Sequence, residues 1–130
     1  MRLTLLALMF TVGCGGSATP SAPTFPEISL GELKPLVDAK SVILLDVNGS
    51  DSYREGHIPG AIDFDANKDQ LAALLPADKQ SLIVAYCGGP KCSAWKDGAE
   101  AVASLGYEQV KHFKDGISGL KASNPVQTVQ

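Results

Sequence analysis

The sequence has little of what nucleic-acid-binding proteins use. Aromatic residues make up 6% of it, too few for the stacking platforms typical of single-strand binders. Its 14 aspartates and glutamates outnumber its 11 lysines and arginines, and no basic cluster occurs. We therefore expect no nucleic-acid partner. The apolar fraction of 45% is ordinary for a globular protein, and 130 residues give room for one domain.

Hydrophobic runs long enough to cross a bilayer are also missing. The apolar stretch at residues 3–12 is far shorter than the roughly 20 residues that a spanning helix needs. It follows an arginine and has the length of a signal-peptide core, so residues 1–13 are predicted to be a signal peptide. The end of this stretch, with Gly13 directly before Cys14, resembles a bacterial lipoprotein signal, although Thr11 departs from the usual leucine. An ordinary signal peptide is the alternative.

The lipoprotein resemblance implies cleavage before Cys14 and lipidation of its thiol. Residues 14–26 are rich in Gly, Ser, Thr, Ala and Pro and are predicted to be a flexible tether. The predicted domain then occupies residues 27–125. The resemblance further implies a bacterial protein exported to the cell envelope, facing the periplasm and held at a membrane by its N-terminal lipid.

Cysteines are scarce, and lipidation of Cys14 would leave only Cys87 and Cys92. In an exported protein such a pair is either a disulfide or a reactive pair of thiols. Four residues separate the two, whereas a thioredoxin-type motif has two. No second Cys/His pair lies nearby to complete a zinc site, so we expect no metal.

Short strands and helices alternate along the sequence. Apolar, β-branched runs predict four strands, at residues 41–47, 61–64, 81–86 and 110–113. Apolar residues at helical spacing follow a capping box at Ser29 and Glu32, and further helices are expected at residues 50–55, 67–75 and 93–105. This order predicts an α/β fold with a mostly parallel central sheet flanked by helices. Functional sites in such sheets lie beyond the carboxyl ends of the strands.

Cys87 directly follows the apolar strand at 81–86. A Gly-Gly-Pro loop leads from it to Cys92 and to the helix expected from Ser93. The glycines permit the backbone angles of a tight anion-binding loop, and a helix N-terminus lowers the pKa of a nearby thiol. We therefore predict that Cys87 is a nucleophile. The residues expected to surround its sulfur are Gly88, Gly89, Pro90, Lys91, Cys92 and Ser93.

Several motifs, in order and spacing, resemble those of rhodanese-like domains. The resemblance covers residues 27–124, and it rests on Leu44-Leu45-Asp46-Val47, Tyr53-x-x-Gly56-His57-Ile58-Pro59-Gly60-Ala61, Tyr86-Cys87, Leu105-Gly106-Tyr107 and Asp115-Gly116-Ile117. It implies a sulfurtransferase whose loop cysteine, Cys87, carries sulfane sulfur as a persulfide from a small donor to a thiol or another nucleophilic acceptor. Asp46 and His57 are expected to support the structure around this site rather than to perform acid–base chemistry.

Two positions depart from the pattern of many members of this family. Asn48 stands where they carry an arginine after Asp-Val, and Cys92 stands where they carry an arginine before the helix serine. A preference for thiosulfate is therefore uncertain. Cys92 could resolve a Cys87 persulfide by forming a disulfide, or it could be a buried structural thiol. The alternative function is a non-enzymatic or redox binding module with a Cys87–Cys92 disulfide. Phosphatase chemistry would need a loop arginine to bind phosphate, and none is present.

Overall fold

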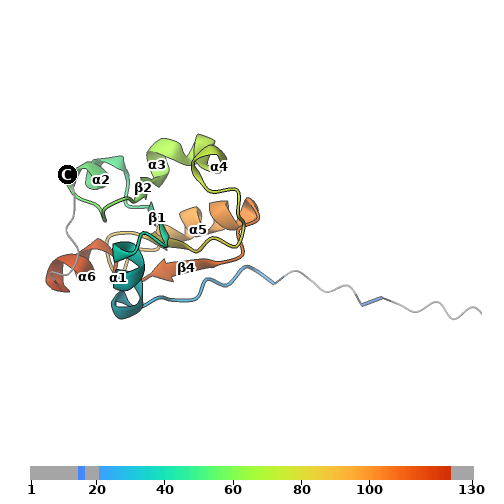
Figure 1. Ribbon diagram of the computed structural model, residues 1–130, viewed down its shortest axis with the longest axis horizontal. Coiled ribbons are helices and arrows are strands. Elements are labelled where there is room, and N and C mark those ends of the chain that lie inside the picture. Colours follow the sequence, from blue (N-terminus) through green and yellow to red (C-terminus); the bar gives the residue numbers. More distant parts are fainter. Residues whose placement is uncertain (1–14, 17–20, 124–130) are drawn as a thin grey trace, which may run out of the picture.

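Four short parallel strands form the centre of the structure (Figure 1). They are β1 (Ile43–Asp46), β2 (Ile62–Asp63), β3 (Ile83–Tyr86) and β4 (Val110–Phe113). The sheet order is β2-β1-β3-β4, so β1 and β3 are central. The computed structural model describes residues 15–16 and 21–123. Cys14 and the predicted signal peptide lie outside the described residues.

Side chains of the central strands alternate between two apolar layers. Leu45, Ile83 and Ala85 face one layer, whereas Leu44 and Val84 face the other. All five are almost completely buried, as expected for parallel strands covered on both faces. This confirms the predicted α/β fold with a parallel sheet flanked by helices.

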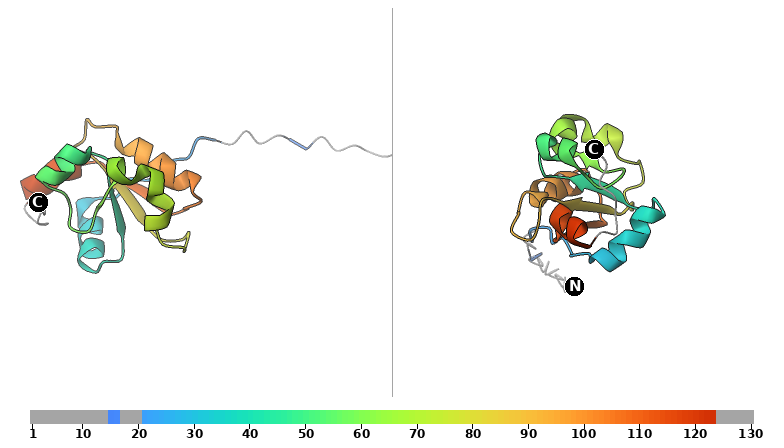
Figure 2. Two further views of the ribbon diagram at one scale, coloured as in Figure 1. Left: turned by 90° about the horizontal axis from the view of Figure 1, so that it is seen from above. Right: turned by 90° about the vertical axis from the view of Figure 1, so that its left-hand side faces the viewer.

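Helices lie on both sides of the sheet (Figure 2). The first layer is completed by the segment of α3 (Phe64–Asn67), a 3₁₀ turn at Lys68–Gln70 and α4 (Leu71–Leu74), together with α5 (Trp95–Ser104). The second layer is completed by α1 (Leu30–Asp38) and α6 (Gly116–Ser123). The remaining helix is α2 (Ser50–Glu55). Gly98 of α5 lies so close to the sheet that a Cβ there would be 2.6 Å from a methyl group of Val47.

The predicted elements differ from the observed ones mainly at their ends. The capping box of α1 is present: the Ser29 hydroxyl accepts from the Glu32 N–H, and the Glu32 carboxylate accepts from the Ser29 N–H. The single helix expected at 67–75 is divided among α3, the 3₁₀ turn and α4. Helix α5 begins at Trp95, two residues after the predicted start, because Ser93 and Ala94 accept tighter bonds from Lys96 and Asp97.

The end of the predicted tether is attached to the domain. Residues 25–28 run alongside β4 (Figure 1), with His112 donating to Pro26 and accepting from Ile28. The Phe25 ring packs edge-on against Trp95. The docked segment therefore starts two residues before the predicted domain boundary at residue 27. No helix within residues 15–16 and 21–123 is long and apolar enough to cross a membrane.

Candidate active site

The carboxyl ends of the strands are level with one another. Asp46 of β1 pairs in register with Tyr86 of β3, and Tyr86 pairs with Phe113 of β4. Cys87 follows Tyr86 and therefore emerges from the middle of the sheet, between the chain segments that leave β1 and β4. This is the edge at which ligands bind in open α/β sheets.

The sulfurs of Cys87 and Cys92 are joined in a disulfide, with their Cα atoms 6.3 Å apart. The Cys92 N–H donates to the Gly89 carbonyl at 3.0 Å, which closes the loop into a turn. Cys87 is only 2% exposed, whereas Cys92 is half-buried. The structure thus brings together the two cysteines that the sequence singled out.

The first turn of α6 holds the start of this loop. Ile117 and Ser118 donate their backbone N–H groups, each at 3.0 Å, to the carbonyls of Cys87 and Gly88. This approach requires glycine at position 116, because a Cβ there would collide with the carbonyl oxygen of Cys87 and lie 2.9 Å from the Gly89 nitrogen. The positive φ of Gly116, 56°, also favours glycine. The first turn of α6 therefore fixes the backbone at the start of the loop.

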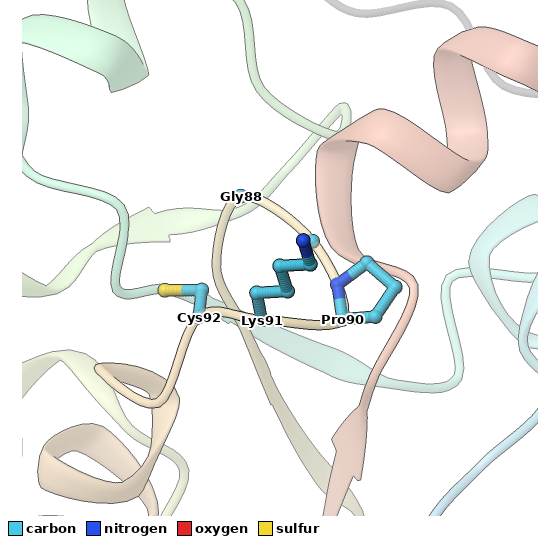
Figure 3. Close-up of a pocket in the computed structure, with 5 residues that line it drawn as sticks. Gly88, Pro90, Lys91 and Cys92 are labelled. Atoms are coloured by element: carbon cyan, nitrogen blue, oxygen red, sulfur yellow. The ribbon is translucent and has the colours of Figure 1, made fainter.

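The loop borders an open hollow of about 450 Å³ (Figure 3). Five of the six residues predicted to surround the Cys87 sulfur line it, namely Gly88, Gly89, Pro90, Lys91 and Cys92. Ser93 is exposed beside them but is not among the lining residues. The sulfur of Cys92 points away from the side chains of Lys91 and Pro90. The residues that line the hollow thus include one lysine and one of the two bonded cysteines.

Beside the loop, a buried hydrogen-bond network connects the ends of β1 and β3 with the turn at Ile58. The Tyr86 hydroxyl donates to Asp46 Oδ2 at 2.7 Å and accepts from the Ile58 N–H at 3.1 Å. The Asn48 N–H donates to Asp46 Oδ1 at 2.9 Å. Burial raises the pKa of the Asp46 carboxyl, and the Tyr86 and Asn48 hydrogen bonds lower it in part. Burial, with the Asp46 charge adding to it, also raises the pKa of Tyr86, so its hydroxyl stays protonated.

His57 lies in the turn that supplies Ile58 to this network. Its Nδ1 is 2.8 Å from the Tyr53 carbonyl oxygen, and its ring stacks on the Tyr53 ring at 3.7 Å between centroids. The Tyr53 hydroxyl donates to the Ala61 carbonyl at 2.7 Å. These contacts place Asp46 and His57 in the structure that carries the loop.

We expect Tyr86→Phe to destabilise the fold by about 1–3 kcal/mol, because the change leaves the buried Ile58 N–H without an acceptor and removes a donor from Asp46. Urea denaturation measures the loss. Tyr53→Phe is the matched control: its hydroxyl makes one hydrogen bond and lies in a half-buried side chain. Equal losses in the two variants would contradict the role assigned to the network.

We expect Asp46→Asn to be most destabilising at acid pH. An amide cannot accept from both Asn48 and Tyr86, which gives a loss of about 1–3 kcal/mol. In the wild type the raised pKa means that the folded state binds a proton more tightly than the unfolded state does. The stability that this tighter proton binding adds to the wild type is complete below the ordinary pKa of 3.8. It is lost as pH rises through the pKa that Asp46 has in the folded state. Urea denaturation of both proteins at a series of pH values tests this, and a difference that grows with pH would refute it.

Comparison with known proteins gives the context of this geometry. The family model of the rhodanese-like domain matches residues 29–123, which is most of the chain. The chain belongs to the rhodanese-like family. The matched span contains every strand of the sheet, the Cys87 loop and α6.

Relatives of this rhodanese-like domain have varied names. It is 27% identical to the thiosulfate sulfurtransferase GlpE of Shewanella oneidensis over 104 residues, covering 78% of this chain and 97% of that protein. It is 38% identical over 92 residues to the HTH-type transcriptional regulator Rv0324 of Mycobacterium tuberculosis, covering 69% of this chain but 39% of the regulator. The crystal structure of the Bacillus halodurans protein BH2092 superposes with a TM-score of 0.61 at 28% identity, covering 78% of this chain and 76% of that one. Of these relatives, the one that the chain covers almost completely is named a sulfurtransferase, whereas the regulator is covered only in part.

The rhodanese-like loop of this chain also has contacts that the sequence did not reveal. In the sequence Tyr86 is the last residue of an apolar strand, and the run at residues 116–120 predicts a turn and at most a short terminal helix. The Tyr86 hydroxyl could have been suspected from its place beside Asp46 at the strand ends. Nothing local in the sequence shows that the Ile117 and Ser118 amides meet the loop, since that contact joins segments far apart in the chain.

The two departures from the family pattern both lie at the Cys87 loop. The Asn48 side chain reaches Gly88: a Cβ on this glycine would be 3.3 Å from Asn48 Oδ1. Cys92 is bonded to Cys87. Neither position supplies a cation, so Lys91 is the one basic side chain among the described residues that line the hollow. Within residues 15–16 and 21–123, no group of three or more His, Cys, Asp or Glu side chains could hold a metal ion.

Proposed function

We propose that the protein is a sulfurtransferase that carries sulfane sulfur as a persulfide on Cys87. The observation that supports this most strongly is the position of Cys87, at the carboxyl end of a central strand in a rhodanese-like domain and at the start of a glycine loop. A nucleophilic thiol that must accept a sulfur atom needs a fixed backbone and access from solvent. The hydrogen bonds donated by the α6 amides support a fixed backbone at Cys87. Opening of the disulfide provides access from solvent to its thiol.

In the proposed reaction, reduced Cys87 attacks as a thiolate. It attacks the sulfane sulfur of a small donor, the donor's other sulfur leaves with the bonding electrons, and Cys87 becomes a persulfide. An acceptor thiolate then attacks the outer sulfur, and Cys87 leaves as a thiolate. Lys91 beside the hollow favours an anionic donor, although a preference for thiosulfate is weakened by Asn48 and Cys92 at positions where many relatives carry arginine. The reaction needs no metal and no organic cofactor.

Initial-rate kinetics with thiosulfate and a thiol acceptor test this proposal. A double displacement gives parallel double-reciprocal lines, because the donor product leaves before the acceptor binds. Mass spectrometry of reduced Cys92→Ser protein, in which no second loop thiol can displace the added sulfur, is expected to show one added sulfur atom in the Cys87 peptide after treatment with the donor alone. Absence of both results with several sulfane donors would sink the proposal.

A second candidate function is a redox or binding module without sulfur transfer, and the Cys87–Cys92 disulfide favours it. A stable disulfide leaves Cys87 unable to accept sulfur. The two functions differ in how the pair responds to reduction. In the module, the reduced thiols take up no sulfur from a sulfane donor, release no sulfide and reform the disulfide only when a separate oxidant such as oxygen is supplied, whereas the enzyme turns over donor and acceptor.

We also propose that the chain is exported in bacteria and held at the envelope by a lipid on Cys14, facing the periplasm. Support comes from the sequence of residues 1–14 alone. Membrane fractionation of cells that express the full chain, with Cys14→Ser as control, tests it. Release of the variant but not of the wild type from membranes is the expected result, and equal distribution of the two would contradict the anchor.

A further inference from the structure

The two cysteines of the loop are unequally exposed to solvent. Cys87 is 2% exposed and lies at the base of the loop, where α6 holds its carbonyl. Cys92 is half-buried and lines the open hollow. In thiol–disulfide exchange, access decides which sulfur an incoming thiolate attacks. An external thiol will therefore attack Cys92, and the group that leaves is Cys87.

The loop also keeps Cys92 next to Cys87. The turn from Gly89 to Cys92 and the bonds from α6 to Cys87 and Gly88 hold both ends of the loop, and the Cα separation of 6.3 Å is within the ordinary range for a disulfide. A thiol held at this position reacts with a neighbouring sulfur as an intramolecular group, which corresponds to a very high effective concentration. A dilute external acceptor competes poorly with it.

We propose that this protein reduces sulfane sulfur to hydrosulfide, with Cys92 as the resolving thiol and an external thiol or dithiol as the reductant that attacks Cys92. The proposal rests on the proposed function, because Cys87 must first carry the persulfide. It makes release of sulfide, rather than delivery of sulfur to an acceptor, the main outcome of the site. The Cys87–Cys92 disulfide is then an intermediate of the cycle.

The atoms and electrons of this cycle balance. The Cys92 thiolate attacks the Cys87 Sγ of the persulfide, the bond from Cys87 Sγ to the outer sulfur breaks, and the outer sulfur leaves as hydrosulfide. That sulfur gains two electrons, and the two cysteines lose them as the disulfide forms. A first external thiolate then attacks Cys92 Sγ and expels Cys87 as a thiolate. A second attacks the external sulfur of the mixed disulfide, which releases the oxidised reductant and the Cys92 thiolate.

A single-turnover experiment on the full chain tests the first half of the cycle. Reduced wild type and Cys92→Ser are freed of reductant, treated with thiosulfate or, in a second arm, with cysteine persulfide, and desalted without any thiol present. We expect the wild type to release about one sulfide per chain and to form the Cys87–Cys92 disulfide. We expect Cys92→Ser to keep one sulfur atom on Cys87 and to release at least about tenfold less sulfide.

The outcomes separate this inference from the proposed function. If the wild type holds its persulfide as stably as Cys92→Ser does, with a free Cys92 thiol, Cys92 is not a resolving group, yet the sulfurtransferase remains. If neither protein takes up sulfur from any donor, the proposed function fails, and this inference with it. Should Cys92→Ser fold poorly, Cys92→Ala replaces it, and disulfide formation in the wild type on loading is decisive by itself.

Mapping the mixed disulfide tests which of the two cysteines the external thiol attacks. Oxidised protein is mixed with less than one equivalent of glutathione, quenched with acid and alkylated. Cleavage after Lys79, Lys91 and Lys96 then places Cys87 and Cys92 in separate peptides, 80–91 and 92–96. Glutathione on the Cys92 peptide and alkylated Cys87 are expected, and glutathione mainly on Cys87 would overturn the assignment. Trp95, the only tryptophan, lies three residues from Cys92 and reports the rate of opening by its fluorescence.

Discussion

Replacing Cys87 with serine is expected to lower the rate of sulfur transfer by at least about 10³-fold, because a serine hydroxyl forms neither a thiolate nor a persulfide. The effect is large because no other cysteine in residues 15–16 and 21–123 can take its place: Cys92 lies at the other end of the loop, and the amides of Ile117 and Ser118 in α6 bond to Cys87 and Gly88 instead. The assay uses reduced protein, several sulfane donors and a thiol acceptor.

Two controls make this result specific to the chemistry of Cys87. Cys92→Ser removes the same disulfide, so a loss of activity caused by a weakened fold would occur in both variants. A disulfide that closes so short a loop stabilises by about 2 kcal/mol in the chain-entropy model, equally for the two. Cys14→Ser removes a thiol outside the domain and is expected to leave transfer unchanged. Undiminished transfer by Cys87→Ser would disprove the central proposal.

The parts of this fold that follow from local pattern could be predicted from the sequence. Strand β4 occupies the predicted residues, and β3 and β1 lie within their predicted ranges. These strands could be located because continuous runs of β-branched and aliphatic residues are typical of the buried strands of a parallel sheet. The capping box at Ser29 is also a local pattern, and it marks the start of α1. Helix ends were less certain, as at Trp95, where tight turns replace the first α-helical bonds.

The candidate site was only partly predictable, because it is assembled from distant segments. Cys87 could be located from its strand, glycines and following helix, all of which are neighbours in sequence. The disulfide with Cys92 remained one of several alternatives, since spacing alone does not reveal whether a turn brings two sulfurs together. The support from α6 and from the Tyr86 hydroxyl depends on contacts across 30 residues or so of chain, for which a single sequence has no local signal.

Replacing Gly116 with alanine is expected to destabilise the domain by about 2–4 kcal/mol and to lower sulfur transfer together with it. A residue with a side chain is strained at the φ of 56°, which contributes about 1–2 kcal/mol. The added methyl group also meets backbone atoms of Cys87 and Gly89, which cannot rotate away as a side chain can. Relief of this collision moves α6 away from the loop and breaks the Ile117 and Ser118 hydrogen bonds.

Gly31→Ala is the matched control, because it is the same chemical change in a helix where the new methyl group has no atom within 4 Å apart from its chain neighbours and the backbone of its own helix. Alanine favours the helix there, so this variant is expected to gain about 0.5–1 kcal/mol. Urea denaturation measures both, and transfer assays below the unfolding transition separate a displaced loop from a lower folded fraction. If α6 positions the loop, folded Gly116→Ala transfers sulfur more slowly than folded Gly31→Ala. Equal rates per folded molecule would mean that α6 stabilises the domain without positioning Cys87.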